Sequence, residues 1–293
     1  MIINPILANT LNAVMCGLMS FGLLMTPQKF MQGGAYQAPW FKDLPEERDN
    51  KLYYVGQFMA FVMLGGCVVP TIMYPSSQFL CYQMAVVHSV SIVHTLIFMC
   101  SSAYKNARPT ETNSLGQWYF MSVLSVLFLV LTILACLHDT DNVVDSRQTV
   151  LDKSVANTVM LVFSSVFGVL FILAPRLLFS FFWDDETLPD NADKVLGFKL
   201  IDMTDHEKWW ARCTGTAILS LNLGVLIDMN IHQPVYTVGS LVTISTLTLF
   251  NLHQVTMRPY KSISSRHIWL SWIPNILMSG AVIAVLICGV LYA

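Results

Sequence analysis

Two histidines are the residues of this chain best suited to chemistry. His94 and His253 each lie inside a long apolar segment that contains no Asp, Glu, Lys or Arg. Paired neutral imidazoles can bind a haem iron from both sides, and a single imidazole can hold the magnesium of a chlorophyll-type pigment. The alternative is that each imidazole hydrogen-bonds a neighbouring helix and packs there. No second cofactor motif accompanies them, so the packing role is preferred, and haem, a chlorophyll-type pigment or a quinone near His94 and His253 stays an alternative.

Other patterns that carry chemistry are missing from the sequence. It contains no P-loop, GxGxxG, HExxH or GxSxG motif and no arrangement typical of a catalytic triad. Its formal net charge of -2 gives no basic surface, so no nucleic-acid partner is expected. No Glu or Lys falls deep in an apolar segment, which counts against a proton-coupled pump. The sequence therefore favours a role that is not enzymatic.

The composition predicts a chain that is largely embedded in a lipid bilayer. Of its 293 residues, 55% are hydrophobic and only 12% are charged, whereas soluble domains carry about 25% charged residues. A helix crosses the bilayer core with about 20 mainly apolar residues. The sequence predicts an all-α integral membrane protein with eight transmembrane helices, at 4–26, 53–73, 77–103, 118–138, 154–182, 209–229, 235–257 and 268–292.

The basic residues predict how these helices are oriented. One side of the membrane, called face B here, would hold the segments 27–52, 104–117, 183–208 and 258–267. Only Arg147 and Lys153 fall on the opposite side, which leaves 14 of the 16 Lys and Arg residues at face B (16 − 2 = 14). The positive-inside rule places face B in the cytosol, a stroma or a matrix, and both termini on the opposite, non-cytosolic or luminal side.

Aromatic residues and the remaining histidines also gather near the predicted helix ends. The Trp and Tyr residues near face B predict an interfacial belt, where an amphipathic ring can place its apolar part in lipid and its polar group at the membrane surface. The histidines in loops or at helix edges are expected to be solvated. The belt comprises Trp40, Tyr53, Tyr54, Tyr104, Trp118, Trp183, Trp209, Trp210, Tyr260, Trp269 and Trp272, and these histidines are His138, His206, His232 and His267.

The chain repeats itself. The tripeptide Ala-Asn-Thr at 8–10 recurs at 156–158, and Pro27 recurs as Pro175 at the same separation of 148 positions (156 − 8 and 175 − 27). Both prolines come where a first helix reaches face B and should stop. Because each unit crosses the membrane an even number of times, the two units are predicted to be parallel repeats. The domains expected are 1–138 and 154–293, each with four helices, joined by a linker at 139–153.

The repeat also bears on the first apolar segment. Its second copy is internal and cannot be a signal peptide, so the first copy is expected to be a true membrane span. Asn9 and Asn157 occupy matching places near the outer ends of their helices. There an amide can bond across helices for about 1 kcal/mol. Arg212 lies within a turn or two of face B, so its aliphatic side chain is long enough for the guanidinium to reach the membrane surface. These residues are expected to hold the fold.

A first span that ends in Pro, a variable loop and an aromatic-aromatic-x-Arg-x-x-Gly sequence resemble the DoxX-like group of small four-helix membrane proteins. The second half carries Pro175 and WWARCTG at 209–215. The first half keeps Pro27, the Tyr pair at 53–54 and Gly56 but has no Arg at the matching place. The resemblance implies a tandem duplication of that four-helix unit. Members of the group are linked to quinone-coupled oxidation and to structural roles.

Three functions are consistent with these patterns. The first is a non-catalytic accessory or structural subunit, which packs beside other membrane protein chains in a larger assembly. The second is a transporter or channel for a small or apolar solute, because tandem parallel repeats often enclose a site near the midplane. The Ser- and Thr-rich stretch SLVTISTLTLFN, residues 240–251, could line its path. The third is a membrane redox protein that uses the two histidines.

Overall fold

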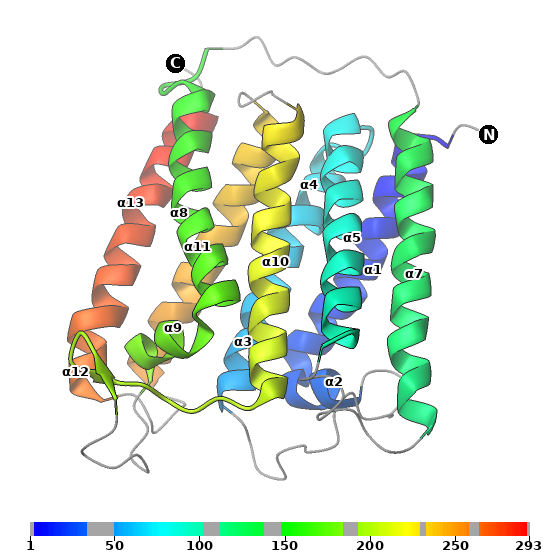
Figure 1. Cartoon of the computed structure of the whole chain (residues 1–293). Coiled ribbons are helices and arrows are strands. Elements are labelled where there is room, and N and C mark those ends of the chain that lie inside the picture. The colour runs from blue at the N-terminus through cyan, green and yellow to red at the C-terminus, as the bar shows by residue number, and fades with distance from the viewer. Residues whose placement is uncertain are drawn as a thin grey trace.

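The computed structural model describes residues 3–33, 50–101, 112–137, 148–183, 193–228, 233–257 and 264–291 (Figure 1). Within these residues the chain forms a bundle of long helices that run roughly side by side. The elements are α1 (Pro5–Met25), α2 (Pro27–Gly33), α3 (Asn50–Met63), the π-helical turn η2 (Leu64–Val68), α4 (Val69–Met73), α5 (Gln78–Met99), α7 (Thr112–Cys136), α8 (Lys153–Leu173), α9 (Pro175–Phe182), β1 (Lys194–Val195), β2 (Phe198–Lys199), α10 (Asp205–Asp228), α11 (Pro234–Met257), α12 (Ser265–His267), the π-helical turn η3 (Ile268–Trp272) and α13 (Ile273–Val290).

Within the described residues, seven helical runs are long and apolar enough to cross a membrane. Two of them are continuous runs through a π-helical turn, 51–73 and 265–290. The expected sixth span corresponds to α10, which is 24 residues long but is not among the seven. It begins with the charged sequence DHEK and buries Thr214, Ser220 and Asn222. Since α3, α5 and α8 all pack against α10, its polar side chains are covered by protein, and it needs less apolar surface than its neighbours.

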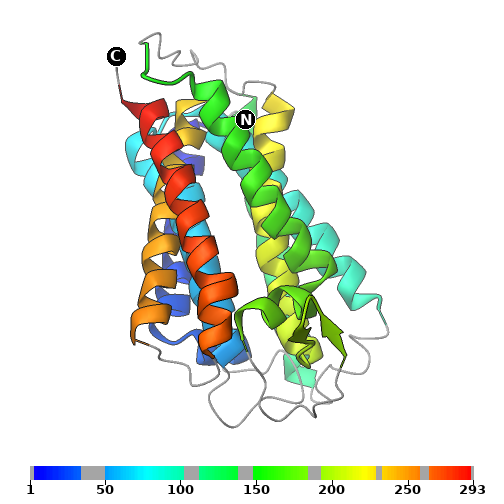
Figure 2. The ribbon, with the colours of Figure 1, turned by 90° about the vertical axis from the view of Figure 1, so that its left-hand side faces the viewer.

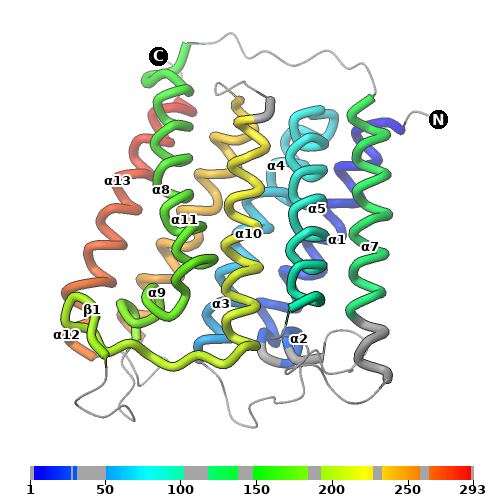
Figure 3. The backbone as a smooth tube through the Cα atoms, viewed as in Figure 1, coloured from blue at the N-terminus to red at the C-terminus, as the bar shows by residue number. Residues whose placement is uncertain are grey.

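The repeated prolines begin new helices. α1 ends at Met25, and Thr26 takes φ −140° and ψ 59° before α2 starts at Pro27. α8 ends at Leu173, and Ala174 takes nearly the same φ −137° and ψ 51° before α9 starts at Pro175. A residue before proline is pushed out of the helical region by the proline ring. The segment expected as one helix over 154–182 is therefore two helices, and α9 turns across the end of α8 (Figure 3).

Helix contacts follow a regular pattern. α5 packs against α7, and α11 packs against α13. Across the middle, α10 contacts α5, while η2 and α4 contact α11. In Figure 1, α10 lies between α5 and α8, and the start of α1 and the end of α13 lie at the same end of the bundle. The position of the first and last helix ends at one end of the bundle is compatible with a multi-pass membrane protein that crosses an even number of times.

The expected belt of interfacial tryptophans is wrong for most of its members. Five of the described tryptophans are at most 7% exposed: Trp118, Trp183, Trp209, Trp210 and Trp272. Trp269 is the exception, at 69% exposed. Near face B the buried rings pack on one another, with Tyr54 4.7 Å from Trp183 and 5.9 Å from Trp272 between ring centroids. Mutual packing buries more ring surface than a headgroup position would, so these aromatics form a core. Trp40, Tyr104 and Tyr260 lie outside the described residues.

A small hairpin is the exception to the expected all-α architecture. β1 and β2 pair antiparallel, and the turn between them places Leu196 at φ 52° and Gly197 at φ 82°. Positive φ suits glycine, which has no Cβ to clash. The Arg266 guanidinium lies 5.1 Å from the centre of the Phe198 ring. The hairpin is thereby held against the beginning of α12 at face B.

Two glycines allow a close approach between η2 and α11. A Cβ on Gly65 of η2 would lie 2.7 Å from the backbone nitrogen of Thr243 and 2.9 Å from the carbonyl oxygen of Gly239, both on α11. A Cβ on Gly239 would lie 2.6 Å from the carbonyl oxygen of Gly65. Backbone atoms cannot move aside as a flexible side chain can. The contact between η2 and α11 therefore depends on glycine at both positions.

Gly65→Ala should destabilise the protein by about 2 kcal/mol, because the added methyl overpacks the contact between η2 and α11. Gly280→Ala on α13 is the control, since a Cβ there meets nothing within 4 Å. This control should be neutral or slightly stabilising, because alanine is the better helix former. Thermal unfolding in detergent measures both variants. Equal melting temperatures for Gly65→Ala and Gly280→Ala would contradict the close contact.

Candidate functional site: an uncharged cavity between the helices

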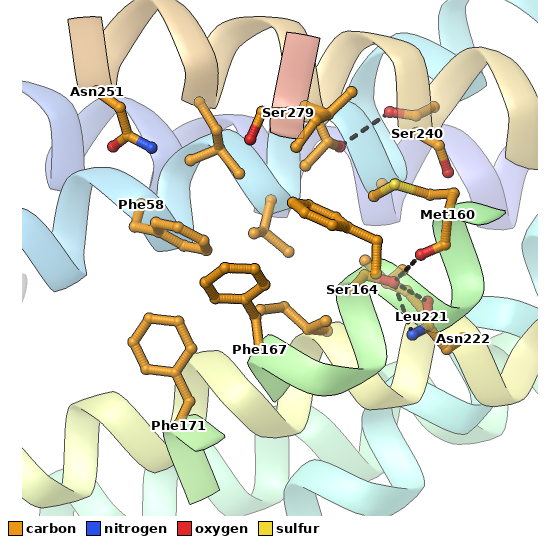
Figure 4. Close-up of a pocket in the computed structure, with 18 of the residues that line it drawn as sticks. Phe58, Met160, Ser164, Phe167, Phe171, Leu221, Asn222, Ser240, Asn251 and Ser279 are labelled. Carbon is orange, nitrogen blue, oxygen red and sulfur yellow. Dashed lines mark hydrogen bonds between the residues drawn. The ribbon is translucent and has the colours of Figure 1, made fainter. Parts of the chain in front are cut away.

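A cavity lies among the helices and is lined by residues of the α3–α4 run and of α5, α8, α9, α10, α11 and α13 (Figure 4). About 970 Å³ within it is free of atoms, counting the part that opens to the surroundings. The described residues that line it include no Asp, Glu, Lys, Arg or His. Aromatic and aliphatic side chains make up most of the wall, with a few Ser, Thr, Asn and Tyr residues between them. This composition is typical of ligand sites, in which a few polar groups orient an apolar molecule.

α11 contributes one continuous face to the cavity. Lining residues recur along it from Val235 and Tyr236 through Ser240, Ile244 and Leu247 to Asn251. This spacing of three or four residues keeps them on one side of a helix. Tyr236 and Asn251 are 15 residues apart (251 − 236), which is about 22 Å along a helix that rises 1.5 Å per residue. The cavity is therefore elongated parallel to the helices.

The end of the cavity near Tyr236 holds a closed hydrogen-bond network. The Tyr236 hydroxyl donates to Oδ1 of Asn222 at 2.9 Å, and Nδ2 of Asn222 donates to Oγ of Ser164 and of Ser165, each at 2.9 Å. Ser164 in turn donates to the carbonyl oxygen of Met160 at 2.7 Å. Both sides of the Asn222 amide thus bond to protein. The network joins α8, α10 and α11 at this end.

The end of the cavity near face B has an aromatic wall and a second asparagine. Tyr54 donates its hydroxyl to Oδ1 of Asn251 at 3.1 Å, which joins α3 to α11. The ring of Phe179 lies 5.1 Å from the ring of Trp183 and 6.2 Å from that of Phe171. These distances fall within the range of favourable ring–ring contacts. The wall at this end is therefore rigid and largely apolar.

One side of the cavity lies between α8 and α13. Leu151, just before α8, donates its amide to the carbonyl oxygen of Cys288 at 2.9 Å, which ties the two helices together at the end opposite face B. The two helices diverge from there toward face B (Figure 2). Phe163 and Phe167 of α8 and Asn275 of α13 line the cavity along this side and are only partly buried. This is the side on which the lining residues reach the outer surface of the bundle.

The described residues that line the cavity suit the binding of a molecule. No acid–base pair or nucleophile with an adjacent base lines the cavity, and the described part of the chain holds no cluster of three His, Cys, Asp or Glu that suits a metal ion. Placing an ion in such a wall without a counter-charge would be costly. The cavity is suited to an uncharged ligand.

The two histidines singled out by the sequence do not line this cavity and do not face each other. His94 stacks on Trp209 of α10, with ring centroids 4.4 Å apart and planes within 9°, and its Nδ1 lies 3.9 Å from Sγ of Cys213. His253 is exposed on the surface of α11. α5, which carries His94, packs mainly on α7 and α10, whereas α11, which carries His253, packs mainly on α13 and η2. The arrangement therefore disfavours a haem held between these imidazoles.

The repeated asparagines each bond to the chain just before another helix. Nδ2 of Asn9 donates to the carbonyl oxygens of Pro75 and Ser77, at 3.0 and 2.9 Å, ahead of α5. Nδ2 of Asn157 donates to the carbonyl oxygen of Gln233 at 3.3 Å, ahead of α11. Both amides thus bind the turn into the third helical run of their half. Both residues are at most 1% exposed.

Arg212 reaches the end of a neighbouring helix. Its Nε donates to the carbonyl oxygen of Ile172 at 3.3 Å, in the last turn of α8. A cation at a helix C-terminus stabilises carbonyls that have no partner within the helix. Pro175 starts α9 only two residues after that turn ends. Arg212 therefore supports the break that Pro175 introduces.

Two histidines expected to be solvated are buried, which corrects that expectation. His206 is 2% exposed, and the Trp210 indole donates to its Nε2 at 3.0 Å. His267 is 4% exposed, and its two ring nitrogens lie 2.7 Å from Oγ of Ser264 and 3.2 Å from the carbonyl oxygen of Ser180. Both sit where loops fold back on helix ends, and local sequence does not reveal that burial. His138 and His232 lie outside the described residues.

Comparison with known proteins gives no relative. No protein-family model matches the chain, and no curated protein and no solved structure matches it.

Sequence reasoning found part of the cavity and missed the rest. The stretch 240–251, singled out as a possible path lining, contributes Ser240, Thr243, Ile244, Leu247 and Asn251. Asn222 and Tyr236 were not singled out, and Tyr54 was named only for the interfacial belt and the family resemblance, not as a cavity residue. Asn222 carried a signal, because an amide inside a membrane-length helix calls for a partner on another helix. Nothing in the local sequence marks the Tyr54 hydroxyl as a group of the cavity, because its hydrogen-bond partner lies 197 positions away.

His206 should make the stability of the protein depend on pH. It precedes the expected sixth span, and burial lowers its pKa to about 4. An unfolded histidine has a pKa of about 6.5, so as pH falls below that value the unfolded chain takes up a proton that the folded chain does not. This effect alone should cost about 2 kcal/mol of stability by pH 5.

His206→Gln should reduce this loss, since glutamine can accept the Trp210 hydrogen bond without titrating. Melting temperatures in detergent at pH 7.5 and 5.0 measure the effect as the difference between wild type and variant. Taking that difference removes the contribution of the other histidines and of the carboxylates near His206. If the melting temperature fell equally in both proteins, His206 would bind its proton as well in the folded as in the unfolded chain, which would contradict the prediction.

Proposed function

We propose that this protein is an integral membrane protein that binds, and can carry, a neutral small molecule that dissolves in the membrane. The observation that carries the proposal is the elongated cavity without a charged lining residue. A ligand that arrives from lipid is already uncharged or poorly hydrated, so entering this cavity requires no further desolvation of charge. Seven apolar helices of membrane-crossing length support the proposal that the protein lies in a bilayer.

The cavity favours solute binding over the other two functions. An accessory subunit that only fills space in an assembly has no need of an interior cavity with a polar group at each end. That role, beside other membrane protein chains, remains a proposal without a specific contact to support it. A redox role through the paired histidines is weakened, because His94 stacks on Trp209 and His253 is exposed. A quinone in the cavity would still fit, as a neutral ligand.

The same proposal includes a tandem duplication of a four-helix unit, as in the DoxX-like group. Equivalent helix contacts support it, since η2 and α4 meet α11 as α10 meets α5. Gly65 and Gly224 are 159 positions apart (224 − 65), as are His94 and His253. A Cβ on Gly224 would lie 3.0 Å from Cα of Gln83 on α5, so both glycines sit at these crossings. The similar backbone at Thr26 and Ala174 adds a third correspondence.

A cavity-filling substitution tests ligand binding. Ser279 is 2% exposed and lines the cavity from α13, whereas the neighbouring Gly280 is exposed and a Cβ there meets nothing within 4 Å. Ser279→Phe should lower the amount of neutral lipid that co-purifies in mild detergent by about tenfold, because its ring occupies the site. Gly280→Phe places the same ring toward lipid and should leave that amount unchanged.

Mass spectrometry of the organic extract measures the co-purified molecules, and size-exclusion chromatography checks that both variants are folded. Ser279→Ala keeps the cavity open and should retain the ligand. If the folded Ser279→Phe protein carries the same neutral molecules in the same amounts as wild type, the cavity is not their binding site and the proposal fails.

Protease protection of tagged protein in sealed vesicles tests the proposed orientation. Tags at the N-terminus and at the C-terminus should both be accessible from the non-cytosolic side. A tag inserted between Leu196 and Gly197, at the tip of the hairpin, should be accessible from the other side, because the positive-inside rule places face B there. Two termini found in different compartments would contradict the even number of crossings.

A further inference from the structure

The two ends of the cavity differ in the hydrogen-bonding groups that the protein leaves unused. At the end near Tyr236, the Asn222 amide uses both its oxygen and its nitrogen in bonds to protein. At the end near face B, Asn251 uses its oxygen, which accepts from Tyr54, and its Nδ2 has no hydrogen-bond partner among the described residues. Asn251 is only 5% exposed. Nδ2 of Asn251 is not among the fully covered polar atoms that lack a partner, so a molecule in the cavity can reach it and accept its hydrogen bond.

The Asn251 amide nitrogen points into the cavity. In Figure 4 the nitrogen of Asn251 lies on the side of the other residues drawn around the cavity, and its oxygen lies on the opposite side. The Tyr54 hydroxyl explains this orientation, because a phenol that donates at 3.1 Å requires the amide oxygen to face it. Tyr54 is itself held among the rings of Trp183 and Phe250, at 4.7 and 5.3 Å. The donor is therefore fixed in place before any ligand arrives.

A second N–H without a partner belongs to a residue of the same wall, although neighbouring atoms cover its nitrogen in this structure. Trp183 lines the cavity, is 3% exposed, and its buried indole N–H has no hydrogen-bond partner among the described residues. Its ring packs against Tyr54, the residue that orients Asn251. Two N–H groups without partners therefore occur at one end of a cavity whose other end is closed by bonds within the protein. Both groups can only donate, so the matching atom on a ligand is an acceptor.

We propose that the cavity recognises a neutral amphiphile with an uncharged carbonyl or ether-type oxygen, bound at Asn251 and Trp183 near face B, with its apolar body along α11. The inference rests on the proposed ligand-binding function and specifies the ligand and its direction. A carboxylate or phosphate is excluded, because no cation lines the cavity to offset its charge. An aromatic or isoprenoid body matches the phenylalanine rings of the wall.

Three probes that differ at one group test this recognition. They are 4′-decylacetophenone, which has a neutral carbonyl, decylbenzene, which has no oxygen, and 4-decylbenzoate, which is charged at pH 8. Tritium-labelled probes are bound to the purified protein in phosphatidylcholine nanodiscs, and empty nanodiscs give the background from partitioning. The wild-type protein should bind the ketone about 25-fold more tightly than decylbenzene, as expected for two net hydrogen bonds of about 1 kcal/mol each, and should not bind the benzoate above background.

Two variants remove the donors while keeping side-chain size. Asn251→Leu and Trp183→Phe should each weaken ketone binding about fivefold, the loss of about one hydrogen bond, and should leave decylbenzene binding unchanged. Trp269→Phe is the matched control, because Trp269 is 69% exposed and does not line the cavity. Thermal unfolding checks that each variant is folded. If one variant does not fold, the other still tests the proposal through the same difference between ketone and decylbenzene.

The outcomes separate this inference from the proposed function. If ketone and decylbenzene bind equally, and Ser279→Phe abolishes the binding of both, the cavity binds apolar molecules but the recognition of an oxygen is wrong. If the benzoate binds as well as the ketone, the assignment of a neutral ligand is overturned. If no probe binds above background and Ser279→Phe changes nothing, both the recognition and the function proposed for the cavity fail.

Discussion

In a bundle of apolar helices, a polar side chain has to find its hydrogen-bond partner on another part of the protein, and this constraint organises the structure. The amides of Asn9 and Asn157 bind the backbone turns that lead into α5 and α11. The amide of Asn222 joins α8, α10 and α11. These bonds favour particular helix neighbours, because apolar surroundings offer the same groups nothing in exchange.

Close approach of helix backbones is a second feature of the packing. Glycines in η2 and α11 bring these two elements nearly into backbone contact, whereas phenylalanine rings of α3, α8 and α9 line the space between the helices nearer face B. Small residues at one level and large rings at another leave space between the helices instead of a filled core. The cavity is thus a consequence of how side-chain size is distributed along the helices. Its uncharged wall then determines what kind of molecule can stay there.

Charge is kept to the ends of the bundle, where it ties loops to helices. Lys51 at the start of α3 pairs with Glu207 at 3.1 Å, and the side chain of Glu207 also accepts from the amide of Thr204 as part of the cap of α10. Arg176 pairs with Asp202 at 2.9 Å. The Arg176 pair is exposed and contributes little stability in water. Such pairs hold the segment before α10 against α3 and α9, close to the end of the cavity that carries Tyr54.

The sequence by itself determined the long helices, the end of the first helix before Pro27 and a polar stretch along 240–251, whereas the span expected over 154–182 proved to be two helices. Hydrophobic length and proline chemistry are local properties, so they can be read from one segment at a time. Only the tertiary structure decided that Tyr54 meets Asn251, that His94 and His253 do not face each other, and that most tryptophans are buried. Those outcomes depend on which helices become neighbours, and that choice is made by packing between segments far apart in the chain.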